Sequence, residues 1–173
     1  MGYVIATVDN SGGIKAFHKV LAAIKDLAED NGWEVQRYVD TGEDQELILK
    51  SLGLSGTEEI YIGFKCYSSS TADYYNIVGA TMVGYVAPNA FEVQPGISMS
   101  GIPCHNNAVT FFITANAQRI AGCFKVGTPV YEHFYLGKYF QYARPGEFPS
   151  PLVVGGMLDG KAATRFSDLS HTF

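Results

Sequence analysis

The side chains best suited to chemistry are three cysteines and four histidines, spread widely along the chain. Cys104 and His105 are neighbours, and His133 follows much later. A thiol, an imidazole and a carboxylate together would form a nucleophilic triad. However, adjacent side chains on an extended segment point to opposite sides. We therefore interpret Cys104 as a structural thiol, since free cysteine usually packs as a small apolar residue, and we expect no catalytic residue and no enzymatic activity.

Metal and phosphate sites are not indicated by the spacing of their usual ligands. The cysteines and histidines do not follow the C-x2–4-C or H-x3–5-H spacing of zinc sites. Two glycine-rich segments, 53–59 and 154–165, lack the Gly-x4-Gly-Lys-Ser/Thr sequence of a phosphate-binding loop. The carboxylates between 40 and 46 are typical of a solvated acidic turn. We expect neither a metal nor a cofactor.

The composition predicts one globular domain that is short of charge. The chain has 173 residues, of which 47% are hydrophobic, 13% aromatic and 17% charged, against a usual charged fraction of about 25%. The formal net charge of −5 argues against nucleic acid as a partner. No apolar run reaches the 18 residues of a membrane-spanning helix, so we expect no membrane partner. Charge is distributed unevenly along the chain, and the apolar composition favours protein interfaces instead.

Periodicity predicts an α+β fold that is mainly β. Apolar residues at three- and four-residue steps indicate an amphipathic helix within residues 11–33, capped by Ser11 and stopped at Gly32. Alternating or β-rich segments predict about five to seven antiparallel strands on which this N-terminal helix packs. These segments are 33–39, 45–51, 59–67, 74–86, a hairpin over 108–126, and 129–140.

Two segments resist assignment, although both are apolar. Residues 87–107 show neither helical nor alternating periodicity. The same holds from about residue 143 to the end, which we interpret as an irregular C-terminal arm of the single domain 1–173. Ordered loops of this length are unusual in compact domains. We expect them to lie on the surface of the domain or on a neighbouring chain.

Aromatic residues are dense just before this arm and predict an interface with other subunits. Tyr131, Tyr135 and Tyr139 fall on one face of the predicted strand, and Phe134 and Phe140 on the other. A strand that is apolar on both faces is buried on both, and tyrosine is favoured at protein interfaces. The interface candidates are Tyr131, Tyr135, Tyr139, Phe140, Tyr142, Phe148, Leu152, Val153 and Val154.

Three stretches of the chain resemble a family of virion structural proteins of tailed bacteriophages. They read ELILKSLGLSGTEEIYIGFKCY, VGTPVYEHFYLGKYFQYARPGEFPSPLVVGGML and AATRFSD, and the resemblance covers about residues 45–173. The family more often reads GPGLSG where this chain has KSLGLSG, but Gly53 and Gly56 of that turn remain. The resemblance implies a tail-associated or baseplate-associated role without a catalytic motif.

These observations together predict a structural subunit of a tailed-phage virion, in the tail baseplate or tail-tip region. Its partners would be copies of itself and other virion proteins, assembled from the host cytoplasm. Unpaired cysteines fit that compartment. A capsid decoration or head–tail connector protein is the alternative. A glycan-binding module with exposed tyrosines and Trp33 is less favoured, because one tryptophan is a thin basis for a ligand site.

Overall fold

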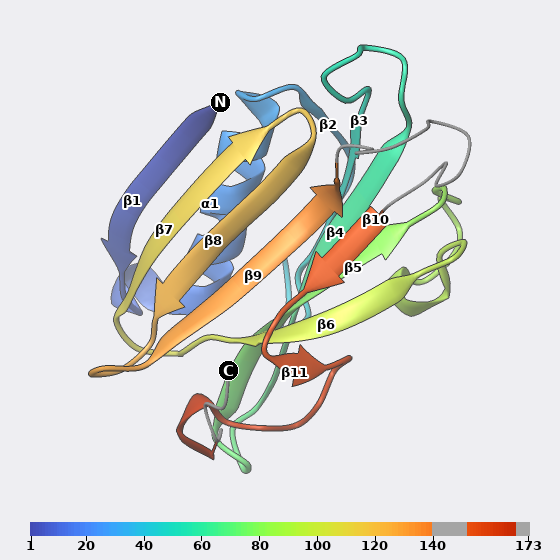
Figure 1. Ribbon diagram of the computed structural model, residues 1–173. Helices are drawn as coiled ribbons and strands as arrows, with labels where there is room; N and C mark the ends of the chain where they lie inside the picture. The colour runs from blue at the N-terminus through green and yellow to red at the C-terminus, as the bar shows by residue number, and fades with distance from the viewer. Residues whose placement is uncertain (140–151, 169–173) are drawn as a thin grey trace.

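Two antiparallel β-sheets form the protein, seen in a computed structural model that describes residues 1–139 and 152–168 (Figure 1). Sheet A has the strand order β1-β7-β8-β9-β10, and sheet B the order β11-β6-β5-β4-β3-β2. Sheet A consists of β1 (Gly2–Val8), β7 (Val109–Asn116), β8 (Arg119–Lys125), β9 (Tyr131–Lys138) and β10 (Leu152–Gly155). Sheet B consists of β2 (Trp33–Val39), β3 (Glu46–Ser51), β4 (Ile60–Ser69), β5 (Tyr74–Met82), β6 (Ser98–Pro103) and β11 (Leu158–Asp159).

The mainly β fold with one α-helix near the N-terminus is confirmed. Every predicted strand segment contains a strand, but the strands divide between two sheets. Four strands were missed, β1, β6, β10 and β11, and the predicted hairpin turns at Ala117–Gln118. Within the described ranges, none of the helices has the length and apolar character needed to cross a membrane.

The single α-helix, α1 (Ala16–Glu29), starts later than the sequence suggested. Ser11–Gly13 form a separate 3-10 turn, with Gly12 at φ +72°, so Ser11 is not the N-cap. The N-cap residue is Lys15, whose side chain makes no capping hydrogen bond. Instead, Oδ1 of Asn10 accepts a hydrogen bond from the N–H of Ala16, the first residue of the helix, at 2.8 Å. Gly32 follows the helix with φ +88°, as its predicted stop position requires.

Helix α1 lies between the two sheets on one side of the molecule. It contacts β1 and β7 of sheet A and β2, β3 and β4 of sheet B, and Figure 1 shows it behind β7 and β8. On the other side, β9 and β10 contact β4, β5 and β6 directly. The helix therefore fills the space where the sheets diverge, and its apolar stripe, including Phe17, Leu21 and Ile24, is fully buried there.

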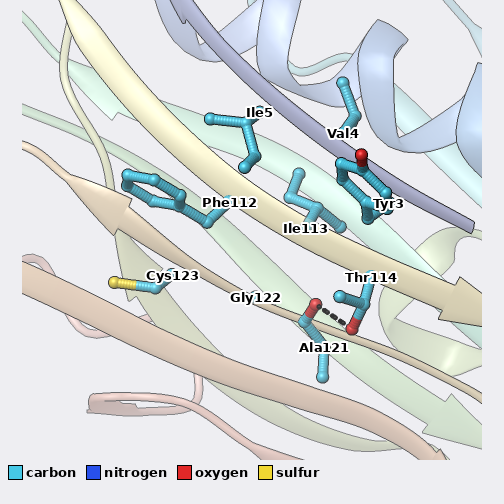
Figure 2. A pocket seen from close by; sticks show the side chains of 9 residues that line it. All are labelled: Tyr3, Val4, Ile5, Phe112, Ile113, Thr114, Ala121, Gly122 and Cys123. Carbon is cyan, nitrogen blue, oxygen red and sulfur yellow. Dashed lines mark hydrogen bonds between the residues drawn. The ribbon is translucent and has the colours of Figure 1, made fainter.

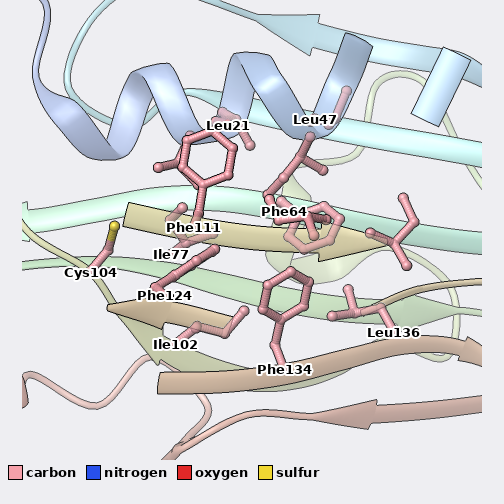
Figure 3. Close-up of a cluster of buried hydrophobic side chains, with 14 of the residues drawn as sticks. Leu21, Leu47, Phe64, Ile77, Ile102, Cys104, Phe111, Phe124, Phe134 and Leu136 are labelled. Carbon is pink, nitrogen blue, oxygen red and sulfur yellow. The ribbon is translucent and has the colours of Figure 1, made fainter. Parts of the chain in front are cut away.

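The main core joins the inner faces of both sheets (Figure 3). The rings of Phe64 in β4 and Phe134 in β9 meet edge to face, with centroids 5.9 Å apart. A second, smaller cluster covers the opposite face of sheet B around Val78, Met82 and Phe91. Strand β4 is thus buried on both faces, which explains why so few of its side chains reach solvent.

The β7–β8 turn fastens sheet A to the ends of β2 and β3. Trp33 Nε1 donates to the Asn116 carbonyl at 2.8 Å, and Ser51 Oγ donates to the Ala117 carbonyl at 2.6 Å. The backbone N–H of Leu54 donates to Oε1 of Gln118 at 3.1 Å. Trp33 is only 3% exposed, so it belongs to the main core.

The segment 87–107 lies on its own domain. Phe91 is fully buried in the cluster that covers sheet B. The buried Gln94 binds the backbone of the loop on both sides, since its Oε1 accepts from Val86 N–H and its Nε2 donates to the Val86 and Asn89 carbonyls. The end of the segment forms β6, which pairs with β5. Of the two expected positions, the surface of the domain or a neighbouring chain, this segment takes the first.

Part of the predicted C-terminal arm is regular. Strand β10 pairs with β9, placing Leu152 opposite Lys138 and Val154 opposite Leu136. Strand β11 pairs with β6 and is the edge strand of sheet B at the end opposite β2. The interpretation of residues 152–159 as irregular is therefore wrong, because each short strand forms by pairing with an earlier strand and has no periodicity of its own.

Candidate assembly surface on the outer face of sheet A

The strand register brings the outward side chains of sheet A into rows. Alternation along β1, β7, β8 and β9 sends every second side chain away from α1 and the core. One row contains Tyr3, Thr114, Ala121 and Tyr135; the next contains Ile5, Phe112, Cys123 and His133; the third contains Thr7, Thr110, Lys125 and Tyr131. We call these three rows the outer face.

Large apolar side chains of the outer face are open to solvent. Tyr3 is 74% exposed, Ile5 59% and Phe112 41%. These residues and Cys123 surround a shallow hollow of about 450 Å³, shown in Figure 2. A hydrogen bond from Thr114 Oγ1 to the Ala121 carbonyl, 3.3 Å long, crosses its floor. Contiguous exposed apolar surface of this kind marks interaction sites more often than chance.

The charges near the outer face are basic. The five strands of sheet A place Arg119 and Lys125 on this face, while Lys138, opposite Leu152, pairs with Glu58. Their one carboxylate, Glu132, has a side chain that points to the inner face. The Arg119 guanidinium lies 5.9 Å from the ring centroid of Tyr135. A partner of this surface would therefore meet apolar groups with a few cations and no outward carboxylate from the sheet strands.

The predicted interface residues fall on both sides of sheet A. Tyr131 and Tyr135 belong to the outer face, and Tyr139, 48% exposed, stacks on Tyr135 with ring centroids 4.9 Å apart. Leu152 and Val154 pack against the main core instead. Val153 lies opposite Gly137, between these two inward residues. Phe140, Tyr142 and Phe148 lie outside the described residues.

The best candidates for surface contact were missed from the sequence. Tyr3 and Ile5 belong to a strand that was not predicted, and Phe112 was assigned to a hairpin without a choice of face. The available signal was the alternation of Tyr3, Ile5 and Thr7 with Val4 and Ala6. It is weak because both sets are apolar, so the pattern does not say which set is exposed.

The residues that could form a thiol triad are not brought together. Cys104 is in the main core, 2% exposed, and burial raises the pKa of its thiol to about 12. His105 Nδ1 is 3.0 Å from Oδ1 of Asn106, and its ring contacts Phe166. His133 is exposed on the outer face, across sheet A from the core. Cys104 is thus neither ionised nor oriented for nucleophilic attack.

Glu132 is an unusual group beneath the outer face. It is fully buried on the inner side of β9, and neither carboxyl oxygen has a hydrogen-bond partner. Burial raises the pKa of Glu132 to about 7. Its neighbours include the thiols of Cys104 and Cys123, whose pKa values its charge helps to raise.

The fold and the outer face together define an all-antiparallel two-sheet protein with one amphipathic α-helix packed on both sheets and one open apolar sheet face. No protein-family model and no curated protein matches the sequence. Among the side chains of residues 1–139 and 152–168, no three of His, Cys, Asp or Glu are grouped to hold a metal ion. The outer face is therefore the feature on which a functional proposal can rest.

Proposed function

We propose that the protein is a structural subunit of a tailed-bacteriophage virion, in the tail baseplate or tail-tip region, and that it acts by assembly. The observation that carries this proposal is the outer face of sheet A, where Tyr3, Ile5 and Phe112 stay exposed beside basic side chains. Interface cores are depleted in carboxylates and rich in aromatic residues, and this face has both properties.

The resemblance of residues 45–173 to virion structural proteins supplies the setting. Its first stretch corresponds to β3, the following turn and β4, and the second to β9 and β10. The turn holds Gly53 at φ +66° and Gly56 at φ +74°, so the glycines retained in this chain occupy backbone positions that favour glycine.

The location of the protein in the particle tests this proposal. An epitope inserted between Thr41 and Gly42 would lie on an exposed turn outside sheet A. We expect gold-labelled antibody to mark the distal end of the tail of phage that carry the tagged gene, in electron micrographs. Tagged phage of normal infectivity and unlabelled wild-type phage are the controls.

Two results would overturn the proposal in different ways. Label on the capsid shell or at the neck would replace the baseplate with the capsid decoration or connector alternative. Absence of the protein from purified, infectious particles would remove the structural role altogether.

A further inference from the structure

Strand β1 is an exposed sheet edge without the usual protection against pairing. It is the terminal strand of sheet A, and Figure 1 shows it as the outermost strand on the left. Its sequence, GYVIATV, contains no charged residue and no proline. Its register with β7 runs from Gly2↔Ala115 to Val8↔Val109 without a shift. Natural proteins commonly block such edges with lysine, proline, bulges or short strands.

The other sheet edges carry these protective features. Strands β10 and β11 have four and two residues. Strand β2 contains Glu34 and Arg37, and its register shifts between Val35 and Arg37. Strand β1, with seven residues, is therefore the one long, uncharged and regular edge among the described strands.

We propose that two copies of this chain pair through β1, antiparallel and about a two-fold axis at Ile5, to form one continuous ten-stranded sheet. The axis at Ile5 uses the whole strand, because Ile5 is the central residue of Gly2–Val8. In this register Ile5 lies opposite its own copy, and Tyr3 lies opposite Thr7 of the other copy. An aromatic residue opposite a β-branched one is a favourable cross-strand pair.

The charges nearest β1 do not oppose pairing with a second copy. Asp9, just after the strand, is the nearest carboxylate in sequence and forms an ion pair with Lys19 at 3.6 Å. In the antiparallel register the two Asp9 residues lie at opposite ends of the pair, separated by roughly 25 Å at the strand rise. The net charge of −5 therefore does not oppose the contact locally. A two-fold pair also unites both outer faces in one surface.

Pairing through β1 deepens the proposed function. Only the setting of the dimer, a phage particle, rests on that function. The paired sheet would bring the two hollows lined by Tyr3, Ile5 and Phe112 to either side of the axis. The repeating unit offered to neighbouring virion proteins would then be a dimer with one broad apolar face.

Lysine substitutions distinguish edge pairing from packing of one outer face on another. We expect the purified chain to sediment as a dimer, and Ile5→Lys to raise the dimer dissociation constant by at least about tenfold, because two like charges would lie directly opposite each other. The matched control is Phe112→Lys, since Phe112 is the partner of Ile5 one strand further in and has similar exposure. This control should leave the dimer intact. Thermal unfolding of both variants shows that they are folded.

Disulfide trapping tests the register itself. In a Cys123→Ser background, Ile5→Cys should give a cross-linked dimer under mild oxidation, since directly opposed residues have Cα atoms about 4.5–5.5 Å apart, within disulfide range. Phe112→Cys is again the control, because three strand spacings of about 4.8 Å would separate it from its copy. It should not cross-link. The background removes Cys123, which pairs with Phe112 within the chain.

The outcomes separate this inference from the proposed function. A monomeric wild-type chain, equal dissociation by Ile5→Lys and Phe112→Lys, or no cross-link through Ile5→Cys would overturn β1 pairing. Each of these results leaves the location of the protein in the virion unchanged. Conversely, a stable β1 dimer from a protein absent from the virion would overturn the proposed function alone.

Discussion

At the scale of single residues, Glu132 is the side chain whose chemistry differs most from its usual state. Alternation along β9 places Glu132 on the same face as Phe134. It did not predict that the carboxyl group would be fully buried without a hydrogen-bond partner. Burial depends on what covers the strand, and sheet B, which supplies the cover, comes from distant parts of the sequence. A charge in such a site is disfavoured, so the group stays protonated to higher pH.

Replacing Glu132 with glutamine should remove a pH-dependent loss of stability. The pKa of Glu132 is raised to about 7 in the folded protein, while the unfolded chain ionises near about 4.3. The unfolded state is therefore favoured as pH rises between these values, and the free energy of unfolding falls. We expect Glu132→Gln to match wild type near pH 4 and to be up to about 3 kcal/mol more stable at pH 8, by urea unfolding.

The exposed Glu34 on β2 provides the control for this comparison. Glu34→Gln should shift the free energy of unfolding by less than about 0.5 kcal/mol at either pH. If wild type and Glu132→Gln keep the same difference in stability from pH 4 to pH 8, then Glu132 does not titrate in the folded protein as we expect.

At the scale of elements, a chain of ion pairs holds the segment before β6 onto sheet B. Lys65 in β4 is 3.1 Å from Glu46 in β3 and 3.0 Å from Glu92, and Lys161 is 2.8 Å from Glu92. Arg37 pairs with Glu46 at 3.2 Å and donates to backbone carbonyls of the segment. Burial opposes the charge of Glu92, but hydrogen bonds with Lys161 and Lys65 outweigh it and lower its pKa to about 2.

Removing the central cation should destabilise the protein strongly. Lys65→Met leaves Glu46 and Glu92 on partly buried sites without the lysine between them, so we expect a loss of about 3 kcal/mol in urea unfolding at pH 7. The difference from wild type should shrink as pH falls from about 4.5 towards about 2, where Glu92 becomes protonated in both chains.

The more exposed lysine of the same cluster provides the comparison. Lys161 has 32% of its side chain exposed, against 11% for Lys65, so Lys161→Met should cost at most about 1 kcal/mol. Equal losses for the two variants would show that burial of Lys65 is not what makes its ion pairs important.

The elements that sequence reasoning found are those with a local signature. Helix α1 has a full apolar stripe, and β4 alternates cleanly from Ile60 to Cys66. By contrast, β6 (SMSGIP) mixes apolar residues with serine, glycine and proline without a clear alternation. Strand β11 has two residues, which form a strand through pairing with β6. The division into two sheets was also missed, because it follows from where α1 separates the strands, which depends on long-range packing.

At the scale of the whole molecule, the two sheets have different surroundings. Sheet B is covered on both faces, by the main core and by the smaller cluster around Phe91. Sheet A is covered on its inner face, while the outer face keeps Tyr3 and Phe112 exposed. The acidic turn of residues 40–44 lies outside sheet A. This asymmetry was visible in the sequence only as an uneven distribution of charge, which could not indicate the face concerned.

If the outer face is an assembly surface, its aromatic residues should be protected in the particle. Hydroxyl radicals oxidise exposed side chains, so Tyr3, Phe112 and Tyr131 should be modified in the isolated chain and several-fold less in intact virions, measured by peptide mass spectrometry. These side chains are 74%, 41% and 42% exposed. Leu54, 56% exposed on the turn between β3 and β4, is the internal reference for unspecific shielding. Protection of Tyr3 without Phe112 and Tyr131 would restrict the contact to the β1 edge. Equal oxidation of all three in virions and in the isolated chain would show that the outer face stays open to solvent in the particle. That result would contradict its role as an assembly surface, on which the proposed structural role rests.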